Sequence, residues 1–531
     1  MVEHHQQVSI MHYALETDDI IYNILQHVKS SKMDLINVAK TRRELSDPAL
    51  NMLWCEQYSL TPLIKCLPQE TWEAAHNGTR IVFTCEPSLT DWERVRINAS
   101  RIRRLVAHPD VLLPCMKPDG PVLRKLFALF PPSQLFPNIR ALHFGAVSQL
   151  PEFRSDFPLL RQFLSPELET LSFDLPVDVP TSEVEQLLGV LSAEVSGLRE
   201  LSINGDPDLD AFHFQLPKLP KLNKLSVVGW DVGVRWDNIP NIQYSDRLQS
   251  LTLSVRGPFN IGNPLGNVRL KLSTLKHLSV DGFRLQDCTA FLLQVSTPQL
   301  SAIEISYNDM PASPAQITAV IESLAASCRT FGSLEKFSLV DYSMGNRRDF
   351  DPHSLLHSHI FRPLFQYRRL SAVNFGDIGR YCLDDMFIED VAVAWPGLRE
   401  LKFAEEKRQT TDVTFAAMLS LASKCRSLHT LQLSFNATDF PTLPHAPDGT
   451  RELWPTQTAL HELHVAHSVV SEASSFHLFL AVVFPSLARL THAEHLQFRK
   501  IKELWEQLLK EREMNPAIVA TWRDSLLQPQ P

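Results

Sequence analysis

The sequence predicts an α/β protein in which a curved solenoid of parallel strands and helices follows a small all-α unit. Two observations lead to this fold class. A short phrase of apolar residues recurs thirteen times along the chain, and a unit of this kind buries its apolar side chains only against stacked neighbours. Ahead of this array, three short amphipathic segments follow one another near the N-terminus. The 531 residues, 44% of them hydrophobic, are enough for a large folded core.

The first amphipathic segment predicts a helix that begins after Thr17. Threonine is a favourable N-cap, and the two aspartates that follow it suit the first helical turn, where the backbone dipole is positive. Ile20, Ile24 and Val28 recur at helical spacing and form one apolar stripe, with Leu25 beside it.

Two further helices are predicted before residue 56. Ser31 can cap the second helix, which presents Leu35 and Val38. Asp47 followed by Pro48 predicts the start of the third helix, because aspartate is a good N-cap and proline is favoured at the first helical position. The apolar residues of this third helix are Leu50, Leu53 and Trp54. Three helices of this length cannot bury so many large apolar side chains by themselves, which predicts a partner surface.

Residues 57–137 are expected to form a helical linker and the N-terminal cap of the array. Apolar residues between Trp92 and Val106 recur every three or four positions, which predicts a helix with a cationic, solvated face. The arginines of that face are Arg94, Arg101 and Arg104. The repeated phrase also fits at Ile102, so the sequence leaves two starting points for the solenoid, Ile102 and Ile139.

The array itself is assigned to residues 138–495. The leading apolar residues of its phrases are Ile139, Leu168, Leu198, Leu222, Leu248, Leu275, Leu300, Leu334, Leu370, Leu398, Leu428, Leu460 and Leu487. The twelve intervals from Ile139 to Leu487 average 29 residues, at the upper edge of the range for leucine-rich repeats. The first twelve phrases end on an apolar, variable, apolar triplet, which is typical of a short strand with alternating side chains, and His492 takes the last apolar place in the thirteenth.

Amphipathic segments between the phrases predict helices, for example at residues 182–195, 315–328 and 414–425. The expected arrangement is a horseshoe, with a parallel sheet on the concave side and helices on the convex side. A charged helix at 503–514, within the final region 496–531, is expected to cap the open end of the array.

The fifth position of each phrase lies between two buried strand residues and should point into the concave face. The side chains at this position are those of His143, Ser172, Ser202, Ser226, Thr252, Ser279, Glu304, Ser338, Asn374, Lys402, Gln432, His464 and Thr491. Small hydroxyls dominate the first two thirds, and larger polar groups gather later. A solvated ladder and a binding surface both account for this column. If a substrate binds here, we expect contacts at Glu304, Lys402, Gln432 and His464 and at the long loops beside them.

The N-terminal segment resembles an F-box, in particular that of fungal F-box proteins with leucine-rich repeats. The similarity covers about 40 residues and is carried by three motifs. The first is A-L followed by I and then by I-L. The second is V-A-x-T-x-R from Val38, and the third is P-A-L followed by L-W, from Pro48 to Trp54. The resemblance implies that residues 1–56 dock on a Skp-type adaptor, and through it on cullin and RING subunits. The repeats would then hold a protein substrate for ubiquitin transfer.

The resemblance also implies which residues face the adaptor or support that face. These are Ile20, Ile24, Leu25, Val28, Leu35, Val38, Leu45, Pro48, Leu53 and Trp54. For Leu45 and Leu53, packing between the helices is an equal alternative to adaptor contact. Asp18 stands where the family usually has proline, and Arg42 where it often has cysteine or another small residue. A leucine-rich-repeat scaffold with a degenerate F-box therefore remains the second hypothesis.

Other classes of function are not expected. The net charge is −9, and no aromatic platform accompanies the arginines, which argues against nucleic acid. The longest apolar run is too short for a membrane helix. The eight cysteines are scattered, and His461, His464 and His467 are expected on opposite faces of a strand, so we predict neither metal nor cofactor. No catalytic motif is found, and the expected location is the cytoplasm, the nucleus or both.

Overall fold

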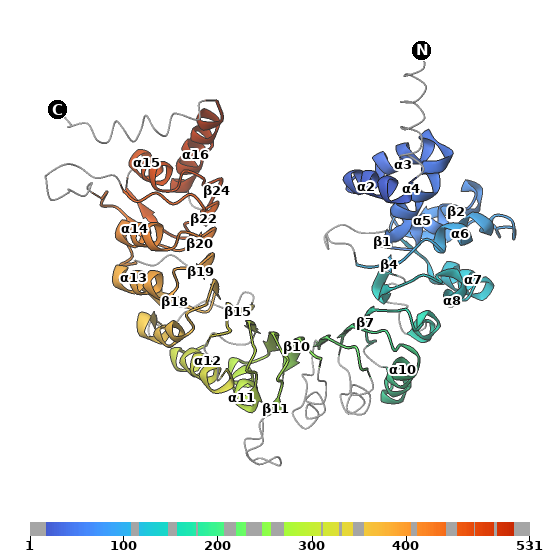
Figure 1. The fold of residues 1–531 in the computed structure, drawn as a ribbon, viewed down its shortest axis with the longest axis horizontal. Coiled ribbons are helices and arrows are strands. Elements are labelled where there is room, and N and C mark those ends of the chain that lie inside the picture. The colour runs from blue at the N-terminus through green and yellow to red at the C-terminus, as the bar shows by residue number, and fades with distance from the viewer. Residues whose placement is uncertain are drawn as a thin grey trace. The chain divides into compact units, whose positions relative to one another are not determined.

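The computed structural model describes residues 17–514, with gaps at 108–115, 147–156, 177–178, 206–218, 230–246, 256–269, 309–311, 329–331, 344–354, 405–410, 442–453, 472 and 493–495. Predictions for the first sixteen residues, the tail after 514 and Cys115 therefore lie outside the described residues. The chain divides into two compact units, Met1–Asp231 and Val232–Pro531, and each is described by itself (Figure 1).

The first unit begins with the three predicted helices. They are α2 (Asp18–Val28), α3 (Lys32–Thr41) and α4 (Arg43–Cys55). Ser31 caps α3 as predicted, because its hydroxyl accepts a hydrogen bond from the backbone N–H of Asp34 at 3.2 Å. The predicted start of the third helix is wrong. The helix begins at Arg43 and contains Pro48, so Asp47 is not its N-cap. The earlier turn lets Leu45 pack against the core of the three helices.

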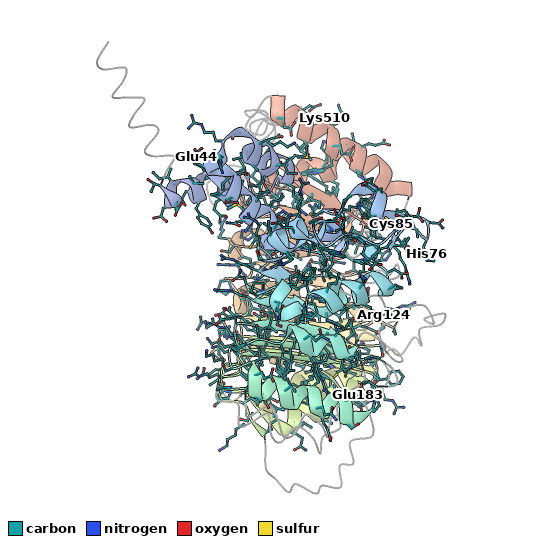
Figure 2. The ribbon with its side chains drawn as sticks, turned by 90° about the vertical axis from the view of Figure 1, so that its right-hand side faces the viewer. Glu44, His76, Cys85, Arg124, Glu183 and Lys510 are labelled. Atoms are coloured by element: carbon teal, nitrogen blue, oxygen red, sulfur yellow. The ribbon has the colours of Figure 1, made fainter. Side chains whose placement is uncertain are left out.

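A small sheet and short helices separate α4 from the regular repeats. The sheet pairs β2 (Trp72–Ala75) with β3 (Arg80–Phe83) in an antiparallel hairpin, and β3 with β5 (Lys117–Pro118) in parallel. The hairpin turn needs a left-handed backbone at three successive residues, His76, Asn77 and Gly78, and glycine adopts this conformation without strain. His76 marks this turn in Figure 2. The short helix α5 (Thr61–Ile64) precedes the hairpin.

The parallel sheet of the first unit starts directly after α4. Strand β1 (Glu56–Gln57) pairs with β4 (Arg104–Leu105), and β4 pairs with β6 (Ala141–His143). The phrase at Ile102 is therefore part of the sheet, which begins earlier than either predicted starting point. The helix predicted between Trp92 and Val106 is shorter than expected, because α6 ends at Ala99 (Trp92–Ala99) and β4 follows it.

Strands β6, β7 (Thr170–Asp174), β8 (Glu200–Asn204) and β9 (Lys224–Val228) continue the parallel sheet in chain order. Helical segments precede β6 and connect β6 to β7 and β7 to β8. These are α7 (Gly120–Leu129), α8 (Pro132–Leu135), η2 (Phe144–Ala146), η4 (Phe157–Phe163) and α10 (Thr181–Glu194). The register places Leu171 opposite both Leu142 and Leu201, so the same phrase position meets itself on each neighbouring strand.

The second unit contains a nine-stranded parallel ladder within its described residues. Its strands are β10 (Ser250–Val255), β12 (His277–Gly282), β14 (Ala302–Tyr307), β15 (Lys336–Asp341), β17 (Ala372–Gly376), β19 (Glu400–Ala404), β20 (Thr430–Gln432), β22 (Glu462–His464) and β24 (Arg489–Thr491). Each of the thirteen predicted phrases therefore contributes a strand, and the fold class is confirmed. Short parallel strand pairs also form outside this ladder. They join β11 (Leu270–Lys271) to β13 (Val295–Ser296), β16 (Leu355–His357) to β18 (Arg380–Cys382), and β21 (Asn436–Ala437) to β23 (Val469–Val470).

Helices lie along one side of this ladder (Figure 1). They are α11 (Leu285–Gln294), α12 (Pro314–Ser327), η9 (Ser358–Ile360), η10 (Arg362–Gln366), α13 (Asp385–Ala394), α14 (Phe415–Lys424), α15 (Ala473–Val483) and α16 (Leu496–Met514). The helices predicted at 182–195, 315–328 and 414–425 are found within one residue, as α10, α12 and α14. A capping box between Ser313 and Gln316 fixes the start of α12.

The core lies between the ladder and these helices. The leading residue and both apolar strand residues of the first twelve phrases are buried, for example Leu398, Leu401 and Phe403, all at most 1% exposed, and so are Leu487 and Leu490 of the last phrase. The helix α16 packs against α15 and β24, Trp505 and Leu508 of this helix are buried, and it begins earlier than the charged helix predicted at 503–514. None of the described helices combines the length and apolar character that a membrane span requires.

Candidate functional site

The three N-terminal helices bury a small core of their own. Ile21, Leu25, Leu35 and Ala49 are at most 3% exposed and form one hydrophobic cluster. Half-buried apolar side chains pack around it, namely those of Val28, Val38, Ala39, Leu45, Met52 and Leu53. Four of the ten predicted adaptor residues, Val28, Val38, Leu45 and Leu53, thus line this core, and two more, Leu25 and Leu35, are inside it.

An apolar stripe remains on the surface of α2. Ile20 is 40% exposed and Ile24 is 45% exposed, one helical turn apart, while Ile21 and Leu25 on the adjacent face are buried. We call Ile20 and Ile24 the α2 stripe. A large aliphatic side chain gains about 1.5 to 3 kcal/mol when it is fully buried, so the α2 stripe is a surface that a partner can cover.

Sequence reasoning missed two further exposed apolar side chains. Tyr22 of α2 is 58% exposed, and Met33 of α3 is 64% exposed. Tyr22 lies two residues from both Ile20 and Ile24, so helical geometry places it on a different face of α2 from the stripe. The angular position of each residue around the helix could have separated these faces in the sequence. Pro48 and Trp54, the remaining predicted adaptor residues, are half-buried on α4.

Both departures from the family pattern lie on the surface. Asp18 is exposed in the first turn of α2, where its charge suits the helix N-terminus. Arg42 is exposed between α3 and α4, with an extended backbone. Neither side chain belongs to the buried cluster, so the three-helix core accommodates both.

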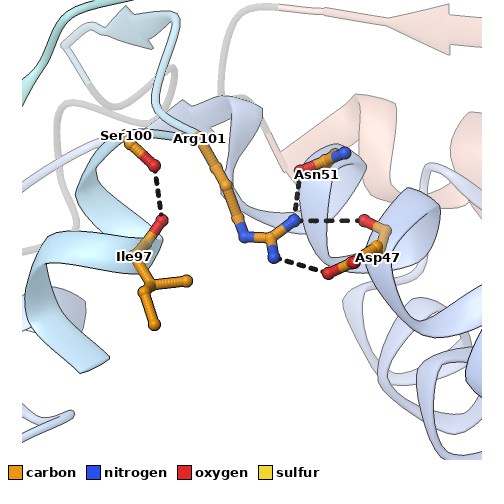
Figure 3. A network of polar contacts seen from close by, with 5 residues as sticks. All are labelled: Asp47, Asn51, Ile97, Ser100 and Arg101. Atoms are coloured by element: carbon orange, nitrogen blue, oxygen red, sulfur yellow. Dashed lines mark hydrogen bonds and ion pairs between the residues drawn. The ribbon is translucent and has the colours of Figure 1, made fainter. Parts of the chain in front are cut away.

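A charged hydrogen-bond network joins α4 to the segment that enters β4 (Figure 3). The guanidinium of Arg101 donates to the Asp47 carboxylate at 2.6 Å, to the Asp47 carbonyl at 3.3 Å and to the side-chain oxygen of Asn51. Arg104 forms a second ion pair, at 2.9 Å, with Glu56. The prediction of a solvated arginine face is therefore wrong for Arg101, whose side chain is 15% exposed against α4, whereas the side chains of Arg94 and Arg104 are exposed as predicted.

Glu56 also accepts a hydrogen bond from the Tyr58 hydroxyl at 3.1 Å. Burial and this contact with Glu56 raise the pKa of Tyr58. The turn after α4 is thus held by polar contacts on both sides. These contacts give the three helices a defined attachment to the first strands of the sheet, β1 and β4.

The open sheet face, which carries the fifth residue of each phrase, shows the predicted column. Register pairs place Lys402, Gln432 and His464 next to one another on β19, β20 and β22. Glu304 lies apart from them on β14, because Ser338 of β15 and a residue of β17 stand between. The structure therefore brings three of the four candidate substrate residues together.

The three neighbouring side chains differ in charge state. Lys402 forms an ion pair with Glu400 on its own strand. The ring of His464 accepts a hydrogen bond at Nδ1 from the backbone N–H of Ala466, at 3.0 Å. Burial, followed by the nearby His492 and His467, lowers the pKa of His464. The result is a surface of mixed polarity, with a neutral imidazole whose Nε2–H is available as a donor.

The described residues contain no cluster of three or more histidine, cysteine or acidic side chains that could hold a metal ion. His461 precedes β22, and His467 follows a turn in which Ala466 has a φ of 42°. Burial raises the pKa of Cys328 and Cys425 to about 11, so both thiols are protonated and unreactive near neutral pH. Cys85, marked in Figure 2, is exposed.

Repeating parallel strands with helices on one side define the fold as a leucine-rich-repeat solenoid. No protein-family model matches the chain, and no curated protein matches it in sequence. Among solved structures, the yeast complex of Rad7 and Elc1 aligns with a TM-score of 0.37 and 12% identity over 67% of this chain and 77% of that chain. A leucine-rich-repeat protein of Leptospira interrogans aligns at 0.32 and 12% identity, over 82% and 88%. Another, from Legionella pneumophila, aligns at 0.31 and 12%, over 57% and 84%.

Proposed function

We propose that the chain is the substrate-recognition subunit of a cullin-RING ubiquitin ligase in the cytoplasm or nucleus. In this proposal the three N-terminal helices act as an F-box and bind a Skp-type adaptor, which connects them to cullin and RING subunits. The repeats bind a protein substrate, and the chain itself catalyses no reaction.

The observation that carries the proposal is the α2 stripe. Ile20 and Ile24 remain 40% and 45% exposed although the three helices already have a closed core of their own. Exposed apolar side chains on a helix surface are typical of helix-mediated protein contacts, because covering them removes apolar area from water. The resemblance of this segment to an F-box implies the same residues as adaptor contacts.

The attachment of the helices to the sheet suits the same function. Arg101 bonds to Asp47 and Asn51, and Arg104 pairs with Glu56, so α4 and β1 are tied to β4 and to the residues that lead into it. A receptor of this kind must present its substrate at a fixed distance from the adaptor. Polar contacts at the junction restrict the motion of the adaptor-binding helices relative to the adjoining strands, β1 and β4.

In this proposal a substrate binds on the open sheet face. Lys402, Gln432 and His464 offer a cation, an amide and a neutral imidazole on three adjacent strands. Such a set suits a polar segment of a protein, since it combines donors and acceptors without a single dominant charge. Glu304 would contact the substrate only at a separate position.

A scaffold without ligase activity is the second candidate. Asp18 and Arg42 favour it, since each replaces a residue that is usual in F-boxes and each is exposed where a partner would meet it. In that case the repeats would bind proteins while the three helices serve only to close the N-terminal end of the sheet.

Co-purification of the tagged full chain with a Skp-type adaptor tests the proposal. We expect wild type to retain the adaptor and Ile24→Asp to lose it, because a carboxylate at a buried apolar contact has a large desolvation cost. Tyr22→Asp is the matched control, with the same charge change on another exposed face of α2. Retention by Ile24→Asp, or absence of the adaptor from wild type, would count against the ligase receptor.

A further inference from the structure

The amino ends of the strands in the second unit form a continuous rim. We define the amino rim, from β10 to β24, as the residue before the leading apolar residue of each phrase together with the two residues after it. Backbone hydrogen bonds of 2.7 to 3.0 Å link the residues that directly follow each leading residue, from Gln249 through Lys276 to Ala488. Adjacent strands are about 4.8 Å apart, so the side chains of the amino rim stand in rows with this spacing.

Positive charge dominates the amino rim. Its acidic residues all pair with cations of the chain, as Glu335 with Arg369, Glu400 with Lys402, and Glu462 with Arg489. The other lysines and arginines of the rim are exposed and form no ion pair within the part of the chain that the structure describes. They are Arg247, Lys276, Lys336 and Arg399. Because the whole chain has a net charge of −9, this positive surface is a local feature.

The opposite ends of the same strands carry acidic side chains. Asp281, near the end of β12, accepts hydrogen bonds from the hydroxyls of Ser254 at 3.4 Å and Ser306 at 2.8 Å. Asp341 ends β15 and accepts a hydrogen bond of 2.8 Å from the backbone N–H of Ser343. The ladder is therefore polarised, so that an acidic ligand is attracted to the amino ends of the strands and repelled by the carboxyl ends.

We propose that the amino rim binds an acidic segment of a partner protein. Between β10 and β19 the rim crosses five strand intervals, or about 24 Å, which an extended segment of about seven residues can span. Lys276, Lys336 and Arg399 stand on every second strand, about 10 Å apart, a distance that about three extended residues cover. A carboxylate at every third residue of the segment can therefore meet each cation in turn.

The chemistry of the rim favours a protein over a nucleic acid. All rim positions are described, and none of them is a phenylalanine, tyrosine or tryptophan on which a base could stack. The glutamates between the cations would repel the continuous charge of a phosphate backbone, whereas a peptide can place neutral residues opposite them. That the acidic segment belongs to a substrate rests on the proposed function, but its binding to the rim needs no adaptor.

Fluorescence anisotropy of a labelled octaglutamate peptide, titrated with the full chain in the absence of any adaptor, tests the proposal. We expect saturable binding at about 50 mM salt and at least tenfold weaker binding at about 500 mM, because salt screens exposed charges. An octaglutamine peptide should not bind. Since no adaptor is present, the result does not depend on whether the three N-terminal helices act as an F-box.

Charge variants locate the binding surface. Lys336→Glu combined with Arg399→Glu should weaken octaglutamate binding at least about tenfold, because two attractive contacts become repulsive. Lys276→Gln combined with Lys336→Gln removes charge without adding repulsion and should weaken binding about threefold. The matched control is Lys271→Glu combined with Lys510→Glu. These two exposed lysines lie outside the ladder, on β11 and α16, and the control has the same net charge as the first variant.

The control should bind octaglutamate within about twofold of wild type, since its charges are changed away from the rim. Circular dichroism checks that each variant keeps the wild-type fold. Absence of wild-type binding at low salt overturns the proposal, as does an equal loss in the rim and control variants. Tighter binding of an oligothymidylate of the same length than of octaglutamate would assign the rim to nucleic acid and overturn it as well.

Discussion

The guanidinium of Arg101 donates a hydrogen bond of 2.6 Å to the carboxylate of Asp47, 54 positions earlier in the chain. The Arg101 side chain is only 15% exposed, whereas that of Asp47 is 77% exposed. The contact therefore has one buried and one solvated partner. It connects helix α4 of the N-terminal segment to the residues that lead into strand β4 of the parallel sheet.

Replacing Arg101 by alanine should destabilise this junction. The variant loses charged hydrogen bonds to Asp47 and Asn51, worth about 1 to 2 kcal/mol once the exposure of Asp47 is taken into account. Urea unfolding of the full chain measures the change. Arg94 is an exposed arginine of α6, the helix that ends shortly before Arg101. The control variant Arg94→Ala should change the free energy of unfolding by less than about 0.5 kcal/mol. Equal effects of the two substitutions would show that the Arg101 network contributes nothing.

Adjacent residues of α2 should respond differently to truncation. Leu25 is 1% exposed inside the three-helix cluster, so Leu25→Ala should cost about 2 to 5 kcal/mol of folding free energy. Ile24 is 45% exposed, and Ile24→Ala should cost less than about 1 kcal/mol. Hydrogen exchange across α2, α3 and α4 reports on this segment separately from the repeats. A severe loss of protection in Ile24→Ala would mean that the stripe is part of the core.

Sequence patterns predicted the repeat architecture well, because each phrase encodes its own strand. Leu401, for example, pairs with Val373 and Leu431, the same position of the neighbouring phrases, so local patterning and tertiary packing agree. The spacing of apolar residues in α10, α12 and α14 likewise predicted the positions of these helices to within one residue.

The remaining features depend on tertiary contacts that periodicity does not contain. Helix α4 begins at Arg43 because Leu45 packs on the cluster, although Asp47 and Pro48 gave the stronger local signal. The pairing of Arg101 with Asp47 joins distant segments. Which isoleucines of α2 stay exposed is decided by how α3 and α4 cover that helix, and residue type alone does not distinguish them.

Stability should fall as the pH is lowered below about 6.5, partly through His464. Burial lowers the pKa of this histidine in the folded chain, so on acidification the unfolded chain binds its proton first. The contribution is fully present above the unfolded pKa and is lost as the pH falls toward the folded pKa. His464→Gln should make the decline between pH 7 and 5 shallower in urea titrations. An unchanged slope in this variant would contradict the assignment.

A proline at position 18, where F-boxes usually have one, separates the two functional hypotheses. If the chain is a working receptor, Asp18→Pro should leave adaptor affinity equal or slightly tighter, because proline restricts the backbone that enters α2 and reduces the entropy lost on ordering. Titration calorimetry with the purified adaptor measures this. A marked weakening would mean that Asp18 itself contacts the adaptor. For a degenerate F-box, neither this change nor Arg42→Cys is expected to create binding.

The central claim is adaptor binding through the α2 stripe, and calorimetric titration of the full wild-type chain with a purified Skp-type adaptor tests it most directly. The account predicts a dissociation constant below tens of micromolar, that is, a binding free energy more favourable than roughly −6 to −7 kcal/mol. Ile24→Asp should weaken binding at least about tenfold, or by about 1.4 kcal/mol, and Tyr22→Asp should not. Absence of wild-type binding at tens of micromolar would contradict the ligase receptor and leave the scaffold.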